Sequence, residues 1–238
     1  LSGKLPLFHF LEGVLKSLGG EPGGITHTLF VKNAARYTQR LPAIVYQLVL
    51  PLCLLTVLCH LRNRRAAAAA GSAGGRLSGL GRSFMTAARE SGFRIDTLRE
   101  WRVWLLFIFM IMTPVIIAVA TSPAFRGKYP YLPELRVSKA FDLFLVYQAI
   151  RGLYMLSWEY LFRGFMISSL RERFGYYAVF FQMLPYVMLH STKPSLELYY
   201  TVPSALLLGV LAYRTRSIWP GFLLHFVGAV LFDFIALY

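Results

Sequence analysis

The chain has 238 residues, of which 56% are hydrophobic and 16% aromatic, and its mean hydropathy is +0.53. Soluble domains are about 45–50% apolar, so this composition and the long uncharged stretches exclude an ordinary soluble domain and predict a membrane protein. The 25 Lys and Arg residues outnumber the 11 Asp and Glu residues, which gives a net charge of +14. Because the basic residues flank apolar segments and no nucleic-acid motif accompanies them, they predict contact with anionic lipid headgroups and not with nucleic acid.

The chain divides into three regions in sequence order. Residues 1–40 carry leucine and phenylalanine side chains spaced as in an interfacial amphipathic helix. Residues 41–120 are expected to form two transmembrane helices joined by a basic, Ala/Gly-rich linker at residues 62–102. Residues 121–238 are expected to form the helical core of the protein.

Six apolar segments are candidates for transmembrane helices, namely residues 41–61, 103–120, 140–170, 176–190, 198–213 and 217–238. A helix needs about 20 residues to cross a hydrocarbon core of about 30 Å, so two of the segments are short. The third is too long and too polar for a simple span. The predicted fold class is therefore all-α, a polytopic membrane helical bundle of about six transmembrane segments with a polar intramembrane cavity.

The positions of the basic residues predict the orientation. If residues 62–102 are cytoplasmic, Arg171 and Arg173 lie on the same side, as do Arg214 and Arg216. That side then holds more Lys and Arg residues than the opposite side, as the positive-inside rule requires.

Ionisable side chains inside apolar segments are the strongest functional signal. Glu159 and Arg163 are four residues apart with the glutamate first, which favours an ion pair on a helix. His190 ends one apolar segment, and His225 and Asp233 lie eight residues apart in the last one. A charge at the bilayer centre costs about 2.5–3.5 kcal/mol, so these residues predict a polar site within the membrane.

Each of these residues also has a structural interpretation. Glu159 and Arg163 form a buried salt bridge in that interpretation, His190 is an interfacial residue, and Asp233 is the partner of His225 on one helix face. In the functional interpretation, one carboxylate and two imidazoles on three segments activate a water molecule and donate to a developing oxyanion.

Three segments resemble the motifs of a known family. They are Trp158-Glu-Tyr-Leu-Phe-Arg-Gly-Phe165, Tyr186-x-x-x-His190 and the final segment around His225. They are similar to the Glu-Glu-x-x-x-Arg, Phe-x-x-x-His and His-x-x-x-Asn/Asp motifs of the CPBP family, the Rce1-like CAAX-prenyl-protease and bacteriocin-processing membrane endopeptidases (Abi family). The resemblance covers residues 140–233, and the sequence around His225 resembles a bacterial branch.

Two positions depart from the family pattern. Trp158 replaces the first of the paired glutamates, so Glu159 occupies the second position. Ala229 stands where Asn or Asp is expected, with Asp233 one helical turn beyond. If the first carboxylate is the base in the family, this chain uses Glu159 or recruits Glu197.

The resemblance implies an intramembrane endopeptidase of the bacterial cytoplasmic membrane, acting on a membrane protein or a lipidated peptide. It implies that Glu159 and His190 activate the water. It also implies that His225, with Asp233, stabilises the oxyanion, and that Arg163 orients Glu159. No cofactor is expected. Zinc held by Glu159, His190 and His225 stays open, although the His-Glu-x-x-His spacing of strong zinc motifs is missing.

Two other functions remain open from the sequence. The departures at Trp158 and Ala229 are compatible with a catalytically silent scaffold or immunity protein. The intramembrane ionisable residues are also compatible with a small ion- or proton-coupled transporter, although no inverted repeat relates the two halves.

Overall fold

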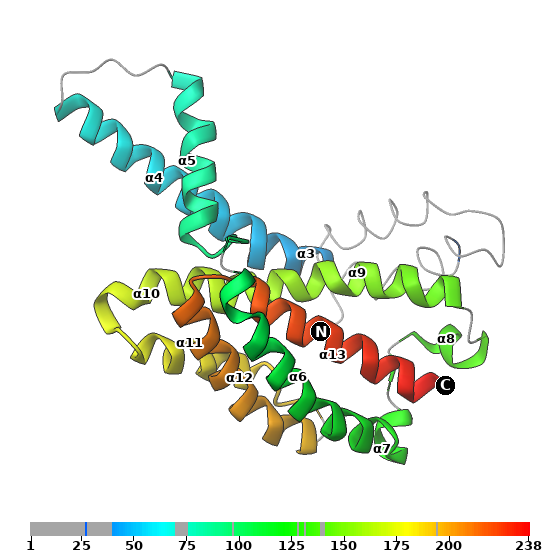
Figure 1. Cartoon of the computed structure of the whole chain (residues 1–238). Coiled ribbons are helices and arrows are strands. Elements are labelled where there is room, and N and C mark those ends of the chain that lie inside the picture. The colour runs from blue at the N-terminus through cyan, green and yellow to red at the C-terminus, as the bar shows by residue number, and fades with distance from the viewer. Residues whose placement is uncertain are drawn as a thin grey trace, which may run out of the picture. The chain divides into compact units, whose positions relative to one another are not determined.

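The computed structural model describes residue 27 and residues 40–69, 76–96, 98–127, 129–130, 132–138, 141–193 and 195–238. The interfacial segment expected at residues 1–40 lies almost entirely outside these residues. The described part of the chain is all-α and contains no strand, which confirms the predicted fold class (Figure 1). Its elements are α3 (Arg40–Ile44), η2 (Val45–Val49), α4 (Leu50–Ala69), α5 (Arg76–Glu90), α6 (Leu98–Ala120), α7 (Pro123–Arg126), α8 (Pro133–Ser138), α9 (Phe141–Glu159), η3 (Tyr160–Met166), α10 (Ile167–Phe174), α11 (Tyr177–Met188), α12 (Ser195–Thr215) and α13 (Trp219–Leu237).

Among the described residues, three helical stretches are long and apolar enough to cross a membrane, at Pro42–Ala67, Ser195–Thr215 and Trp219–Leu237. Shorter apolar helices occupy Ile108–Ala120 and Tyr177–Met188. The helix α12 has 21 residues, more than its apolar segment alone predicted, because polar residues at both ends continue the helix. Helix also fills residues 141–170 of the charged segment, as α9, η3 and α10.

The basic linker predicted at residues 62–102 is helical over much of its length. The helix α4 continues through the alanines to Ala69, and α5 begins at Arg76. Alanine has the highest helix propensity, which accounts for this continuation. The two helices pack together (Figure 1), with Arg62 Nη2 3.1 Å from Glu90 Oε1.

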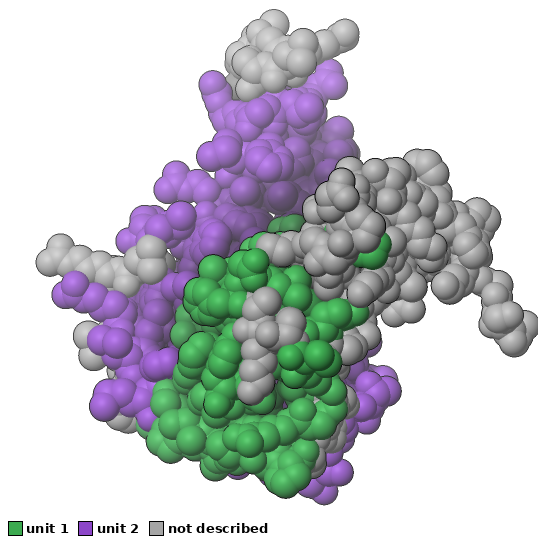
Figure 2. Space-filling model, turned by 90° about the vertical axis from the view of Figure 1, so that its right-hand side faces the viewer, with its two compact units in different colours: residues 1–45, 111–154, 227–238 green, residues 46–110, 155–226 purple. Residues whose placement is uncertain are grey.

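The chain forms two compact units, each assembled from separate segments (Figure 2). Unit 1 comprises residues 1–45, 111–154 and 227–238, and unit 2 comprises residues 46–110 and 155–226. The core of unit 1 consists of Leu132, Leu135, Leu143, Phe144, Tyr147 and Leu237. A core cluster of unit 2 consists of Phe162, Tyr186 and Ala205.

Within unit 2, α11 is held against α12 by a buried amide. Gln182 Nε2 donates to the carbonyl oxygen of Ala205 over 3.0 Å. A Cβ atom at Gly209 would lie 2.6 Å from Gln182, so the glycine allows the two helices to approach. This packing fixes the end of α11, which carries Tyr186 and leads into the turn with His190.

The loop after α5 packs against η3 and the start of α13. Gly92 has a φ of +103°, and its carbonyl oxygen accepts a 3.0 Å hydrogen bond from the backbone N–H of Ile218. A Cβ atom at Gly164 would lie 2.5 Å from the carbonyl oxygen of Ser91, so η3 can approach this loop only with a glycine there. The loop therefore ties together the two segments that carry Glu159 and His225.

Candidate active site

The site is built around Glu159, the last residue of α9. A π-helix, η3, follows it directly. Such π-helical turns are rare in proteins, and those that occur often lie at functional sites. The side chains of Glu159 and Arg163 are both fully buried, and Arg163 Nη1 lies 3.3 Å from Glu159 Oε1. The ion pair predicted from the four-residue spacing is therefore present.

His225 of α13 binds the same carboxylate. Its Nδ1 lies 2.9 Å from Glu159 Oε1. Because a carboxylate oxygen accepts, Nδ1 carries the proton and donates, which leaves Nε2 as the second ring nitrogen. The His225 side chain is 30% exposed, whereas that of Glu159 is fully buried. Of this pair, the imidazole is the group that other molecules can reach.

The second carboxylate oxygen, Glu159 Oε2, has no hydrogen-bond partner among the described residues. Gly221, in the first turn of α13, lies beside it, since a Cβ atom at this position would stand 2.8 Å from Oε2. Sequence analysis missed this role, although Gly221 lies in the Trp-Pro-Gly run four residues before His225. Gly221 thus leaves room for the carboxylate.

His190 lies in the turn that follows α11. Its Nδ1 is 2.8 Å from the carbonyl oxygen of Tyr186, so Nδ1 donates there and Nε2 accepts in the neutral ring. The rings of His190 and Tyr186 have centroids 4.5 Å apart, and the Arg163 guanidinium lies 4.0 Å from the centre of the Tyr186 ring. His190 and His225 are close enough to interact electrostatically.

Trp158 precedes Glu159 and packs among aromatic rings. Its ring meets that of His190 edge-on at 5.7 Å and that of Tyr186 at 6.0 Å. It also contacts Phe162 at 5.5 Å. The residue that replaces the first family glutamate therefore lies directly against His190.

Asp233 belongs to unit 1, where it is fully buried. Its Oδ2 accepts a 2.8 Å hydrogen bond from Gln148 Nε2 and also pairs with Arg151. In the structure, the carboxylate that His225 contacts is that of Glu159. The expected role of Asp233 beside His225 stays a prediction. Glu197, the alternative carboxylate, forms an ion pair with Lys193 at 3.1 Å.

A metal-binding group is absent from the part of the chain that the structure describes, because no three His, Cys, Asp or Glu side chains are arranged to hold an ion. The ring nitrogens that face Glu159 and the Tyr186 carbonyl both carry protons, which leaves Nε2 of each ring as the nitrogen with a free lone pair. Zinc held by Glu159, His190 and His225 stays a prediction.

Comparison with known families gives one match. The family model described as Type II CAAX prenyl endopeptidase Rce1-like matches residues 143–231. This confirms the resemblance identified from the sequence. The match includes Glu159, Arg163, His190 and His225 and ends before Asp233. No curated protein and no solved structure gives a significant match to the chain.

Proposed function

We propose, on the premise that residues 143–231 belong to the Rce1-like family of CAAX prenyl endopeptidases, that the protein is an intramembrane endopeptidase. The observation that carries the proposal is the buried Glu159 carboxylate, which binds Arg163 and a partly exposed His225. Burying a charged carboxylate in a membrane protein costs free energy, so such a residue points to a function. A buried carboxylate next to a partly exposed imidazole is suited to proton transfer.

In the proposed mechanism, Glu159 acts through His225. The carboxylate holds the imidazole as the Nδ1–H tautomer, and its charge stabilises the imidazolium that forms when Nε2 takes a proton from water. Arg163 keeps Glu159 ionised. This assignment differs from the sequence expectation that Glu159 itself removes the proton, because Glu159 is fully buried and His225 is partly exposed.

His190 completes the proposed site. Its Nδ1 donates to the Tyr186 carbonyl, so the Nε2 lone pair is available to position the attacking water by accepting a hydrogen bond from it. The hydroxide equivalent adds to the peptide carbonyl. The proton held by His225 then passes to the leaving amine, so the protons balance without a metal ion.

The proposed substrate is a membrane protein or a lipidated peptide, because the catalytic helices are apolar and the matched family is described by its action on prenylated CAAX proteins. We place the protein in the bacterial cytoplasmic membrane, as a multi-pass protein with its basic side inside.

The test compares peptide termini in membrane proteomes from cells that carry the wild-type chain, Glu159→Gln or His225→Gln. We expect termini that are present with the wild-type chain and lost with either variant, at equal protein levels. The matched control is Ser191→Ala, an exposed position in the turn after α11, which retains the termini. Termini that persist with both site variants contradict the proposal.

A second candidate function is that of a catalytically silent relative. The specific observation for it is Trp158, whose ring occupies the place next to His190 at the position of the first family glutamate. A silent protein gives no specific termini in the wild-type form, and Trp158→Glu then generates them. A protease of the proposed type gives termini without this change.

A further inference from the structure

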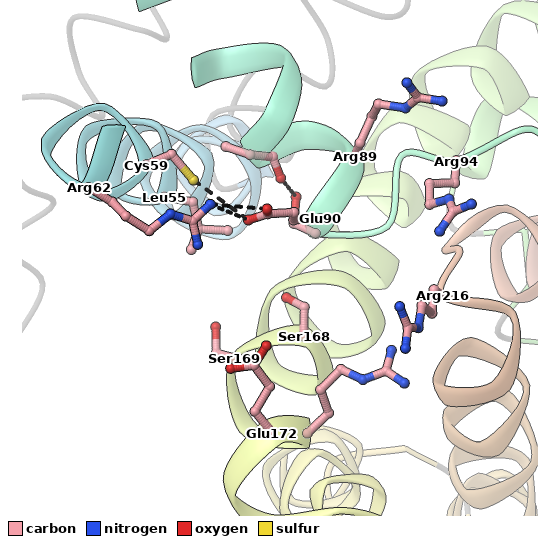
Figure 3. A pocket seen from close by; sticks show the side chains of 13 residues that line it. Leu55, Cys59, Arg62, Arg89, Glu90, Arg94, Ser168, Ser169, Glu172 and Arg216 are labelled. Atoms are coloured by element: carbon pink, nitrogen blue, oxygen red, sulfur yellow. Dashed lines mark hydrogen bonds and ion pairs between the residues drawn. The ribbon is translucent and has the colours of Figure 1, made fainter. Parts of the chain in front are cut away.

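Unit 2 contains a pocket of about 570 Å³ whose lining does not include Glu159, His190 or His225. Arginines from five separate segments line it: Arg62 of α4, Arg89 of α5, Arg94 of the following loop, Arg171 of α10 and Arg216 of the turn before α13. Figure 3 shows Arg94 and Arg216 on one side of the pocket, with Cys59, Arg62 and Glu90 on the other.

The carboxylates around this pocket do not balance its guanidinium groups. Glu90 and Glu172 are the acidic residues of the lining, and Glu90 pairs with Arg62 at 3.1 Å. Asp96, outside the lining, pairs with Arg94 at 2.9 Å and lies 3.9 Å from Arg89. The lining therefore keeps an excess of positive charge. Like charges gathered around one concave space raise its potential and attract an anion.

Arg216 is held in place by a constrained backbone. Its φ is +52°, a left-handed conformation that is costly for a residue other than glycine and persists where neighbouring contacts fix it. Such contacts are present, because Ser217 Oγ donates to the carbonyl oxygen of Arg94 over 2.6 Å. The turn with Arg216 and the loop with Arg94 are thus fixed to each other before any ligand binds.

The lining also offers hydrogen-bonding and apolar groups to the organic part of a phosphate ester. Ser168 and Ser169 supply hydroxyl groups, and Leu55 supplies apolar surface from α4, which lies within a candidate membrane span. Guanidinium groups bind phosphate oxygens through paired hydrogen bonds. Basic pockets between membrane helices bind the headgroups of anionic lipids.

We infer that this arginine pocket binds the phosphate group of a phosphate ester, in which Arg94 and Arg216 contact the phosphate oxygens. The ligand is either the headgroup of an anionic membrane lipid or a soluble phosphate ester, since both carry the same group. The inference does not depend on peptidase activity, because the pocket and the Glu159 site share no lining side chain.

The experiment measures binding to the purified full chain in neutral detergent, with phosphatidylglycerol, phosphatidylcholine, glycerol phosphate and inorganic phosphate as probes. The variants are Arg94→Gln and Arg216→Gly. Arg214→Gln is the matched control, since Arg214 is exposed in the last turn of α12 and does not line the pocket. We expect phosphatidylglycerol to bind more tightly than zwitterionic phosphatidylcholine. Each pocket variant should lower the affinity about tenfold, or about 1.4 kcal/mol.

Arg216→Gly separates loss of binding from loss of folding. Glycine adopts a φ of +52° without strain, so the melting temperature should be equal to or above that of the wild-type chain while binding falls. Tight binding of phosphatidylglycerol alone assigns the pocket to a membrane lipid, and equal binding of glycerol phosphate assigns it to a soluble ester. No binding of any phosphate probe, or an equal loss with Arg214→Gln, would overturn the inference.

Discussion

The two oxygens of the Glu159 carboxylate have different neighbours. Oε1 forms the ion pair with Arg163 and accepts a hydrogen bond from His225 Nδ1, whereas Oε2 lies against Gly221. The carboxylate is held from one side by charge and from the other by the backbone of α13. Its position therefore depends on a residue that has no side chain.

Gly221→Ala tests this dependence. The added Cβ would stand 2.8 Å from Oε2, and the carboxylate cannot move away without weakening its contacts to Arg163 and His225. We expect a loss of about 1–3 kcal/mol in stability from overpacking and a marked loss of peptidase activity. Thermal unfolding in detergent and the terminus assay measure the two effects.

The control for this substitution is Gly81→Ala. Gly81 lies inside α5, and nothing stands within 4 Å of a Cβ added there. Alanine should stabilise the helix by about 0.5–1 kcal/mol and leave activity unchanged. An unchanged activity in Gly221→Ala would show that the carboxylate position is not critical.

At this scale the sequence predicted part of the site. The pairing of Glu159 with Arg163 followed from their spacing, which is a local property of a helix. The contact of His225 with Glu159 spans 66 residues, so no local spacing rule predicted it; only the shared chemistry of these side chains and the family resemblance grouped them in one site. The sequence did not indicate a role for Gly221, because a glycine that leaves room for a neighbouring side chain cannot be told from any other glycine near a helix start.

Between elements, a second buried ion pair joins α9 to α13 within unit 1. Arg151 and Asp233 are 82 residues apart in the sequence, and Gln148 binds the same carboxylate oxygen. The sequence analysis suggested His225 as the partner of Asp233 because a helix places them on one face. It had no means of pairing Asp233 with a residue of a distant helix.

A double-mutant cycle tests whether this pair is structural. Removing one partner of a buried pair leaves an unpaired charge, so Arg151→Met and Asp233→Leu should each cost about 3–5 kcal/mol. The double variant should recover most of the loss. Unfolding measurements on the four proteins give the coupling energy. Additive losses would show that the two side chains are not coupled, and full activity in the double variant would exclude a catalytic role for Asp233.

For the whole molecule, the distribution of basic residues predicts a cytoplasmic location for α5 and an external one for the turn after α11. In a chain with Cys53→Ser and Cys59→Ala, a cysteine at Met85 should react with an impermeant maleimide only after the cells are permeabilised. Met85 is 60% exposed, so its reactivity reports access to the reagent and not burial.

Ser191→Cys in the same background is the matched position on the other side. It is exposed in the structure and should react in intact cells. The reverse pattern at both positions would invert the orientation and move the arginine pocket to the outer side of the membrane.

The sequence predicted the architecture of the molecule better than its details. Hydropathy located the apolar helices because a membrane requires long runs of apolar residues. The composition predicted a linker over residues 62–102, of which residues 62–69 and 76–90 are helical because of alanine propensity and the packing of α4 against α5. The arginine pocket gave no motif, since its arginines come from five separate segments.

The π-helix η3 has a consequence for the register of the chain. Its hydrogen bonds join residues five apart, so each turn holds more residues than a turn of α-helix. Deleting one residue between Tyr160 and Met166 would let the segment become α-helical, and α10 would keep nearly its present orientation because the extra residue of the π-helix adds little rotation. Ser168 and Arg171 would then stay at the arginine pocket, whereas Arg163 would shift relative to Glu159. A single-residue deletion at this point would therefore alter the Glu159 site and spare the arginine pocket.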